Sequence, residues 1–263
     1  MGKSIGITAA GIAIAAALLG GGYYAGRSVG SETTAQPAPV KDRAAIENIV
    51  REYLVTNPDV IVEVQAALEA QQETRQRETA LAAISSSREQ IFNLATDGIA
   101  GNPDGEITLV EFYDYNCGYC KRALPDVTAL IADNPDLRVV LKEFPILGPD
   151  SQRAHQVSLA FQRLVPDRWA EFHDKLMASS GRASEQTAIL LAVTLGADEA
   201  ALKKEMDSPE IAAQVRVTYE LAEKLNITGT PSFVIGDQVV FGAVGKDALQ
   251  EKITEIREKR SGS

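Results

Sequence analysis

Cysteine and histidine are scarce in this sequence, which has two of each among 263 residues. A protein held together by disulfides would carry more cysteines at wider spacing, whereas Cys117 and Cys120 are separated only by Gly118 and Tyr119. The pair also offers too few ligands for a structural zinc site, and no histidine lies close to it in the sequence. The two cysteines are therefore reactive or incidental rather than architectural.

Positive charge is also in the minority. The sequence has 26 lysines and arginines against 36 aspartates and glutamates, which gives a net charge of -10. Proteins that bind nucleic acid usually present a basic face, so we predict no nucleic-acid partner. The sequence points to no cofactor, and none is predicted. The hydrophobic share of 45% is enough for a packed core, so most of the chain should fold.

The N-terminal run 4–26 contains no charged residue. It is long enough for a helix that crosses a bilayer, which needs about 20 residues, whereas a secretory signal usually has a shorter apolar region. We interpret residues 1–30 as an uncleaved signal-anchor, with a cleaved signal peptide as the alternative, and residues 31–41 as an extended linker. Either interpretation sends the rest of the chain out of the cytoplasm, where disulfides form and persist.

Residues 42–88 have the pattern of a helical stalk. The apolar side chains of its first part recur at helical spacing and form one stripe: Ile46, Ile49, Val50, Tyr53 and Leu54. The sequence Asn57-Pro58-Asp59 would end this helix and start a second one, whose apolar seam gives way to the polar run Glu69–Thr79. Because short amphipathic helices are rarely stable alone in water, we predict an oligomerisation segment; the alternative is that the stalk packs on its own domain.

The cysteine pair follows a predicted strand and opens a predicted helix. The run Ile107–Tyr113 is typical of a strand, and Lys121–Asp133 has the apolar periodicity of a helix. Cys117 then lies at a helix N-terminus, where unpaired backbone N–H groups and the helix dipole stabilise a thiolate. Cys120, one turn further on, can resolve a mixed disulfide. Cu(I) could also use two thiolates, so a copper-binding or scaffold protein without turnover stays an alternative.

A second motif lies far downstream, where Thr230 and Pro231 precede an apolar strand pattern. The combination of strand, CxxC, helix and distant Thr-Pro strand resembles the thioredoxin superfamily, and the stretch Val110–Cys120 resembles its DsbA-like branch. This resemblance covers roughly Ile91 to Arg257. The preceding segment, Ala45–Leu68, resembles the N-terminal region of the ScsC-like (suppressor of copper sensitivity C) proteins.

The resemblance implies an α/β thioredoxin fold over residues 89–260, with a helical subdomain inserted at about residues 148–229 and the stalk in front of it. The apolar periodicity predicts four helices in this insertion: Ser151–Leu164, Arg168–Ala178, Glu185–Leu195 and Pro209–Leu225. His155 and His173 fall on these helices, and we interpret both as helix-surface or core residues rather than as ligands or bases.

The resemblance also implies a substrate-binding site beside the cysteines. Pro231 would form a cis peptide bond and lie against the CxxC motif, exposing the backbone of Thr230 for pairing with a substrate strand. Gly118 and Tyr119 complete this predicted site. The alternative is an ordinary trans proline at the start of a strand.

An acidic residue is expected beneath the cysteines. Glu111 lies six residues before Cys117 and matches the family's buried acid, which is costly in an apolar strand unless it is paired or functional. The resemblance makes Lys142, in the predicted strand Leu137–Phe144, its expected partner. We predict that Glu111 relays a proton to and from Cys120; the alternative is a half-exposed strand end with both charges solvated.

The direction of electron flow is inferred from resemblance and from the stalk. Gly118, Tyr119 and Thr230 resemble the isomerase and reductase members more than the strong oxidases, and an oligomer would hold several active sites near one substrate. We predict a periplasmic disulfide isomerase or reductase for unfolded or misoxidised proteins, with residues 4–26 as an inner-membrane tether if they are not cleaved. It would form a homo-oligomer, a trimer by resemblance, and be kept reduced by a membrane thiol reductase of the ScsB/DsbD type. The alternative is a DsbA-type dithiol oxidase.

Overall fold

The computed structural model describes residues 42–261. The predicted signal-anchor or signal peptide and the predicted linker lie outside the described residues. None of the helices between residues 42 and 261 combines the length and the apolar character that a membrane span requires. The chain forms two compact units, with the boundary between Ala67 and Leu68.

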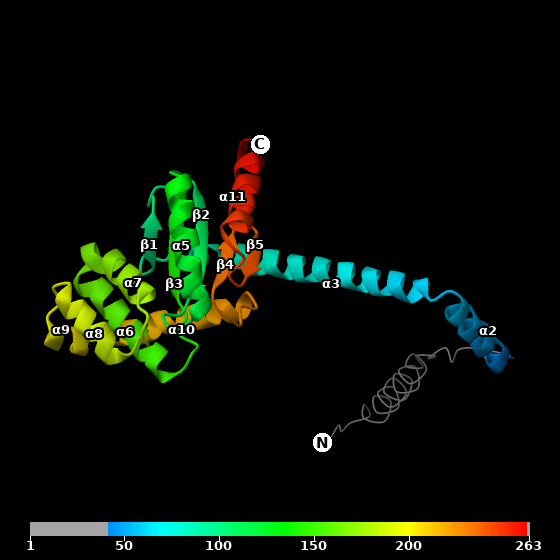
Figure 1. Ribbon diagram of the computed structural model, residues 1–263, viewed down its shortest axis with the longest axis horizontal. Coiled ribbons are helices and arrows are strands. Elements are labelled where there is room, and N and C mark those ends of the chain that lie inside the picture. Colours follow the sequence, from blue (N-terminus) through cyan, green and yellow to red (C-terminus); the bar gives the residue numbers. More distant parts are fainter. Residues whose placement is uncertain (1–41, 262–263) are drawn as a thin grey trace, which may run out of the picture. The chain divides into compact units, whose positions relative to one another are not determined.

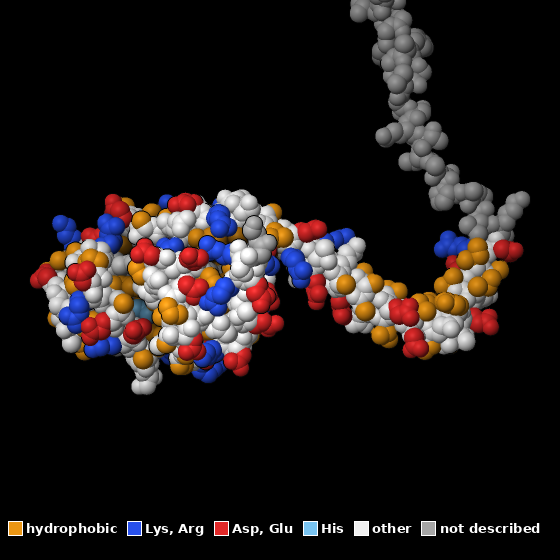
Figure 2. All heavy atoms as spheres, turned by 90° about the horizontal axis from the view of Figure 1, so that it is seen from above, with side chains coloured by type: hydrophobic (Ala, Val, Ile, Leu, Met, Phe, Trp, Pro, Cys, Tyr) orange, Lys and Arg blue, Asp and Glu red, His pale blue; other side chains and the backbone are white. Residues whose placement is uncertain are grey.

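The N-terminal helices are α2, Arg43–Thr56, and α3, Asp59–Ser86. They are separated at Asn57 and Pro58, as predicted, because a residue before proline avoids the helical conformation and proline has no N–H to continue the hydrogen-bond ladder. Between residues 42 and 67 no side chain is buried. Leu54, the last residue of the predicted stripe, and Val60 are half-buried, and eight other large hydrophobic side chains are 48–74% exposed: Ile46, Ile49, Val50, Tyr53, Val55, Ile61, Val62 and Val64. Figure 2 shows hydrophobic atoms gathered along this part of the chain, so the predicted stripe is an exposed face of the single chain.

The second unit is built on a five-stranded mixed sheet with the strand order β1-β3-β2-β4-β5 (Figure 1). The strands are β1 (Gly98–Gly101), β2 (Ile107–Tyr113), β3 (Leu137–Glu143), β4 (Ser232–Ile235) and β5 (Gln238–Phe241). β2 and β3 run parallel, and the other neighbours pair antiparallel. The strand that leads to the cysteines, β2, is therefore the central one, and nearly all its side chains are buried.

Helices surround this sheet. Outside the insertion they are the end of α3, α4 (Arg88–Phe92), α5 (Gly118–Asp133) and α11 (Lys246–Ser261). The insertion between β3 and β4 contains α6 (Pro149–Leu164), the 3-10 helix η1 (Pro166–Arg168), α7 (Trp169–Ala178), α8 (Glu185–Thr194), α9 (Glu199–Met206) and α10 (Pro209–Lys224). The four predicted inserted helices are confirmed to within a few residues at their ends.

The sequence pattern does not predict α9 or β1. α9 has eight residues, too few for a clear periodicity, and β1 has four, of which two are glycines. Gly98 is required by packing, since a Cβ atom there would lie 1.7 Å from the indole of Trp169 in α7. A tertiary contact, not a strand propensity, therefore accounts for the glycine at position 98.

The two faces of β2 meet different helices, because successive side chains of a strand point to opposite sides. Leu109 and Tyr113 belong to one hydrophobic cluster, with residues of α5, α11 and the inserted helices. Val110 and Phe112 belong to the other, with residues of α4, α10 and Ile84 at the end of α3. A residue's position in β2 thus decides whether it faces the cysteine-bearing helix α5 or the opposite layer.

Candidate functional site

Residues 114–116 lead from β2 to the N-cap of α5, and buried polar contacts hold them. The carboxylate of Asp114 is fully buried and accepts four hydrogen bonds. Its Oδ1 accepts from Asn116 N–H and from the Ser151 hydroxyl, both at 2.8 Å, and its Oδ2 accepts from the N–H groups of Ile146 and Leu147 at 2.9 and 3.0 Å. The turn is therefore tied to the loop after β3 and to the start of α6.

The next residue, Cys117, is the N-cap of α5 and is 6% exposed. Its thiol donates to the carbonyl oxygen of Thr230 at 3.1 Å. A hydrogen bond from Cys120 is the largest influence on its acidity and lowers the pKa of Cys117 to about 5. Burial opposes this effect, while hydrogen bonds from the Thr230 side chain and from the N–H groups of Tyr119 and Cys120 add to it. Cys117 can therefore carry a thiolate at neutral pH.

Cys120 has the opposite tendency. It is 1% exposed, and its pKa is raised well above the usual range, first by its hydrogen bond to Cys117, then by burial and by the charge of Glu111. The two thiols thus ionise far apart in pH. Cys117 is suited to attack a disulfide, while Cys120 keeps its proton until a base removes it.

Glu111 lies on the same face of β2 as Leu109 and Tyr113, the face toward α5. It is 6% exposed, and burial, followed by the negative charge of Cys117, raises its pKa to about 8. Between residues 42 and 261 it has no salt-bridge partner. A carboxyl group with a pKa near neutrality beside two thiols can take up and return a proton.

The prediction that Lys142 pairs with Glu111 is wrong. In the parallel pairing of β2 and β3, Glu111 lies opposite Leu141, while Lys142 lies opposite Phe112 and faces the other layer. The Lys142 ammonium there contacts the carboxylate of Asp97 and donates to a backbone carbonyl of α4. A shift of one residue along a strand moves the side chain to the opposite face, and this separates the lysine from the site.

The predicted proline motif lies at the cysteines. The Thr230–Pro231 peptide bond is cis, and the Thr230 carbonyl contacts Cys117 although the two residues are 113 positions apart. The Pro231 carbonyl accepts from Gly242 N–H at 2.9 Å, which connects this segment to the end of β5. The Pro231 segment is thus held next to the sulfur of Cys117.

Exposed apolar side chains lie on segments that contact the site. Tyr119, inside the CxxC motif, is 61% exposed, and the Arg122 guanidinium lies 4.1 Å from its ring centre. Leu147 is 44% exposed on the loop held by Asp114, and Val244 is 41% exposed on the loop that follows β5. Leu147 and Val244 belong to no motif, so the sequence does not predict them.

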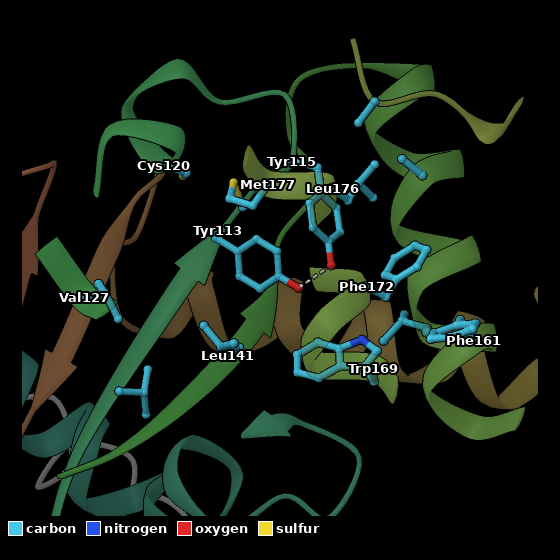
Figure 3. Packing of buried hydrophobic residues seen from close by; sticks show 14 of the residues in the cluster. Tyr113, Tyr115, Cys120, Val127, Leu141, Phe161, Trp169, Phe172, Leu176 and Met177 are labelled. Atoms are coloured by element: carbon cyan, nitrogen blue, oxygen red, sulfur yellow. Dashed lines mark hydrogen bonds between the residues drawn. The ribbon is translucent and has the colours of Figure 1, made fainter. Parts of the chain in front are cut away.

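Both histidines are buried core residues, within the prediction made from the sequence. Each, however, contacts the residue two positions before Cys117. His155 Nε2 accepts from Tyr115 N–H at 3.2 Å, and His173 Nδ1 lies 3.3 Å from the Tyr115 hydroxyl. Figure 3 shows Tyr115 among its buried hydrophobic neighbours, with the hydrogen bond between the hydroxyls of Tyr113 and Tyr115. Sequence reasoning misses these contacts, since they join segments far apart in the chain.

Between residues 42 and 261, no group of three or more histidine, cysteine, aspartate and glutamate side chains could hold a metal ion. A copper-binding role would rest on the two thiolates of the CxxC motif, and it stays a prediction.

Known proteins match both parts of this architecture. Residues 108–254 match the family model of the DSBA-like thioredoxin domain, and residues 42–75 match that of the copper resistance protein ScsC N-terminal domain. Disulfide bond formation protein D of Bacillus subtilis (strain 168) is 26% identical over 165 residues, which cover 59% of this chain and 74% of that protein.

Two solved structures extend the comparison. A thioredoxin-like oxidoreductase from Silicibacter pomeroyi DSS-3 is 38% identical with a TM-score of 0.62, over 65% of this chain and 98% of that one. A linker-deletion mutant of Proteus mirabilis ScsC is 26% identical with a TM-score of 0.65, over 86% of this chain and 100% of that one. The predicted thioredoxin fold, with its helical insertion and its N-terminal helical stalk, is confirmed.

Proposed function

Since the chain belongs to the DSBA-like thioredoxin domain family and is a thiol–disulfide oxidoreductase of the DsbA/ScsC type, we propose that it is a periplasmic disulfide isomerase or reductase. Its substrates are unfolded or misoxidised proteins. The observation that carries the thiol–disulfide chemistry of this proposal is the contrast between the thiols: Cys117, 6% exposed beside Thr230, has a pKa lowered to about 5, whereas Cys120, 1% exposed, has a raised pKa.

The reaction begins at Cys117. Its thiolate attacks one sulfur of a substrate disulfide, so that the S–S bond breaks, a mixed disulfide forms and a substrate thiolate leaves. In isomerisation a second substrate thiolate attacks the mixed disulfide, which makes a new substrate disulfide and returns Cys117 without net electron transfer. In reduction, Cys120 loses its proton and attacks the Cys117 sulfur, so that the mixed disulfide breaks and the second substrate thiolate leaves. The enzyme then becomes the disulfide and the substrate gains two electrons.

Glu111 is the proposed base for the reductive step. With a pKa of about 8 its carboxylate is a stronger base than an ordinary one, and the ionised form can accept the proton of Cys120, whose thiolate is disfavoured by burial and by the charge of Glu111. Lys142, which faces the opposite layer, has no part in this transfer. A membrane thiol reductase of the ScsB/DsbD type would restore the dithiol.

Gly118, Tyr119, Thr230 and Pro231 form the proposed binding surface. An extended substrate segment can pair with the Thr230 backbone while its side chains contact the exposed ring of Tyr119. Main-chain pairing is tolerant of sequence, which suits an enzyme that must accept many misoxidised proteins.

Isomerisation is favoured over plain reduction by the exposed stripe of the stalk. Four hydrophobic side chains of the stripe on α2, Ile46, Ile49, Val50 and Tyr53, are 48–65% exposed in the single chain, and association with further copies would cover them. An oligomer, a trimer by resemblance, would hold several Cys117 nucleophiles near one substrate and raise their effective concentration.

A dithiol oxidase is the second candidate, and the acidity of Cys117 favours it. A stabilised thiolate stabilises the reduced enzyme, which makes its disulfide a stronger oxidant. The reduction potential distinguishes the two, since strong oxidases lie near ~−120 mV and isomerases near ~−180 mV.

The test of isomerase function uses single substitutions in the full chain. Ile49→Glu places a charge in the exposed stripe of α2, and Arg51→Glu places the same side chain on an exposed polar position of that helix as the matched control. We expect Ile49→Glu to lose most of the refolding activity on scrambled ribonuclease while it keeps insulin reduction. Arg51→Glu should keep both activities. Unchanged isomerase activity in Ile49→Glu would contradict the role of the stalk.

A further inference from the structure

Tyr115 is held at its backbone and at its hydroxyl by hydrogen bonds that lead to one carboxylate. Its N–H donates to Nε2 of His155 at 3.2 Å, and Nδ1 of that ring lies 2.6 Å from Oε2 of Glu143. Its hydroxyl lies 2.9 Å from Oγ of Ser158, which donates to Oε1 of Glu143 at 2.6 Å. Glu143, His155 and Ser158 thus form a clamp around Tyr115, here named the Tyr115 clamp.

The clamp is deeply buried and its hydrogen-bonding pattern is specific. Tyr115, His155 and Ser158 are fully buried, and Glu143 is 6% exposed. Because Nε2 of His155 accepts from the backbone N–H of Tyr115, Nδ1 is the ring nitrogen left to donate to Glu143. Buried polar groups that are fully paired specify one arrangement of the chain, since any other arrangement leaves a group unpaired.

The clamp connects the insertion to the nucleophile. His155 and Ser158 lie on one face of α6, the first helix of the insertion, and Glu143 is the last residue of β3. Tyr115 precedes Cys117 by two residues, in the turn that Asp114 also holds. The reaction proposed above uses none of the clamp residues.

We propose that Glu143, His155 and Ser158 are positioning residues for Cys117: by fixing Tyr115 they hold the turn 114–116, so that the sulfur meets the first N–H groups of α5 and the carbonyl of Thr230. This inference rests on the proposed role of Cys117 as the nucleophile. In this role the helical insertion influences the reactivity of Cys117 without contacting the substrate.

The physical reason is the angular dependence of hydrogen bonds, which weaken steeply as donor and acceptor lose alignment. The low pKa of Cys117 depends on donors from Cys120 and from the N–H groups of Tyr119 and Cys120. The direction of the Cys117 side chain depends on the chain that enters α5 from Tyr115. If the turn 114–116 can shift, these hydrogen bonds lose their alignment and the Cys117 thiolate is less stabilised.

Two amide replacements of His155 test its contact with the Tyr115 N–H separately from its contact with Glu143. His155→Gln places an oxygen near the position of Nε2 and can still accept from Tyr115 N–H. His155→Asn places an amide near Nδ1 and keeps the contact with Glu143, but Tyr115 N–H loses its acceptor. Val157→Ala is the matched control, because Val157 is fully buried on the same helix and contributes packing without a side-chain hydrogen bond.

The experiment measures, in the full-length protein, the rate of Cys117 alkylation by iodoacetamide against pH and the redox equilibrium with glutathione. We expect His155→Asn to raise the pKa of Cys117 by about one unit, and His155→Gln and Val157→Ala to shift it by less than about 0.3 unit. At neutral pH a rise of one unit corresponds to a disulfide that is about tenfold harder to reduce, or about 30 mV more negative in potential.

Equal titration curves for wild type, His155→Asn and His155→Gln would overturn the proposal. Equal shifts in His155→Asn and Val157→Ala would overturn it too, since loosened packing would then be the cause. If His155→Asn does not fold, Ser158→Ala replaces it, and a pKa of Cys117 unchanged in that variant counts against the clamp. A wild-type Cys117 with an ordinary thiol pKa would remove the proposed function itself, whereas an acidic Cys117 that no clamp variant shifts would remove only this inference.

Discussion

At the scale of single residues, Cys117 and Cys120 carry the same thiol and differ only in environment. The hydrogen bond between them lowers the pKa of one and raises that of the other, and the N–H groups at the start of α5 add to the difference. Cys117 is the more accessible of the two, 6% exposed against 1% for Cys120. The order of attack in the proposed reaction follows from these two properties.

The apolar neighbours of Glu111 make it a weaker acid than an ordinary carboxyl group. The residues opposite it on β3 and β4 are Leu141 and Phe233, and burial outweighs every other influence in raising its pKa to about 8. Because the folded-state pKa is raised, this group contributes stability that is fully present below about pH 4.5 and is lost as the pH rises through about 8.

Glu111→Gln should therefore remove a pH-dependent loss of stability. Between pH 5 and 8, we expect the unfolding free energy of the wild type to fall relative to that of Glu111→Gln by roughly 2–4 kcal/mol. The measurement is urea denaturation of both proteins in the Cys117–Cys120 disulfide form, which removes the titration of the thiols. Glu258→Gln, at an exposed position of α11, is the control. Parallel pH profiles of wild type and Glu111→Gln would show that Glu111 is not buried as described.

At the scale of elements, the alternation of β3 decides which charges reach the site. Lys142 faces the layer of α4 and α10, and its ammonium pairs with Asp97 while the side chains of both are almost fully buried. This buried pair joins β3 to the segment between α4 and β1. Its place in the structure is therefore that of a connection between layers, remote from the face that bears Cys117.

Removal of one partner of this pair should be more damaging than removal of both. We expect Asp97→Ala to lower the unfolding free energy by about 3–5 kcal/mol, because it leaves the Lys142 ammonium buried without a counter-charge. The double variant Asp97→Leu/Lys142→Met should lose much less, since no charge remains inside. Urea denaturation measures both.

Glu171→Ala, in the exposed pair with Arg168, is the control for that experiment, with an expected loss below about 1 kcal/mol. An Asp97→Ala variant as stable as Glu171→Ala would contradict the assignment of a buried ion pair.

At the scale of the whole molecule, the two units differ in how much of their apolar surface is buried. The unit from Leu68 onward buries its apolar side chains in two clusters around one sheet, whereas residues 42–67 bury none. An exposed apolar stripe of this length is typical of a surface that associates with another chain. The proposed isomerase function depends on that association.

Ile49→Glu should change the mass of the particle in solution. We expect light scattering to give the wild type as an oligomer, a trimer by resemblance, and Ile49→Glu as a monomer, because a charge in a buried apolar seam is costly. Arg51→Glu should keep the wild-type mass. A wild type that remains monomeric at high micromolar concentration would contradict the proposed assembly.

Local signals in the sequence were sufficient for much of this protein. The strand Ile107–Tyr113, the helix that Cys117 opens and the break at Asn57-Pro58 all follow from periodicity, spacing and the backbone chemistry of proline. The Thr230–Pro231 motif was predicted at its place beside the cysteines by resemblance. These features could be inferred because each depends on residues that are close in the chain or on a motif shared by a family.

Only the tertiary structure decided which side chains meet. The sequence placed Lys142 in the correct strand, yet the register of β2 and β3 puts Leu141, not Lys142, opposite Glu111. Tyr115 is contacted by His155 and Ser158 of α6, and both of these contact Glu143 of β3. No local sequence pattern predicts these contacts. Alternate residues of a strand face opposite layers, and only one face of a helix points toward the site, so these two periodicities decide which side chains can meet. Which layer each face contacts is decided by the packing of the layers against one another, not by any segment alone.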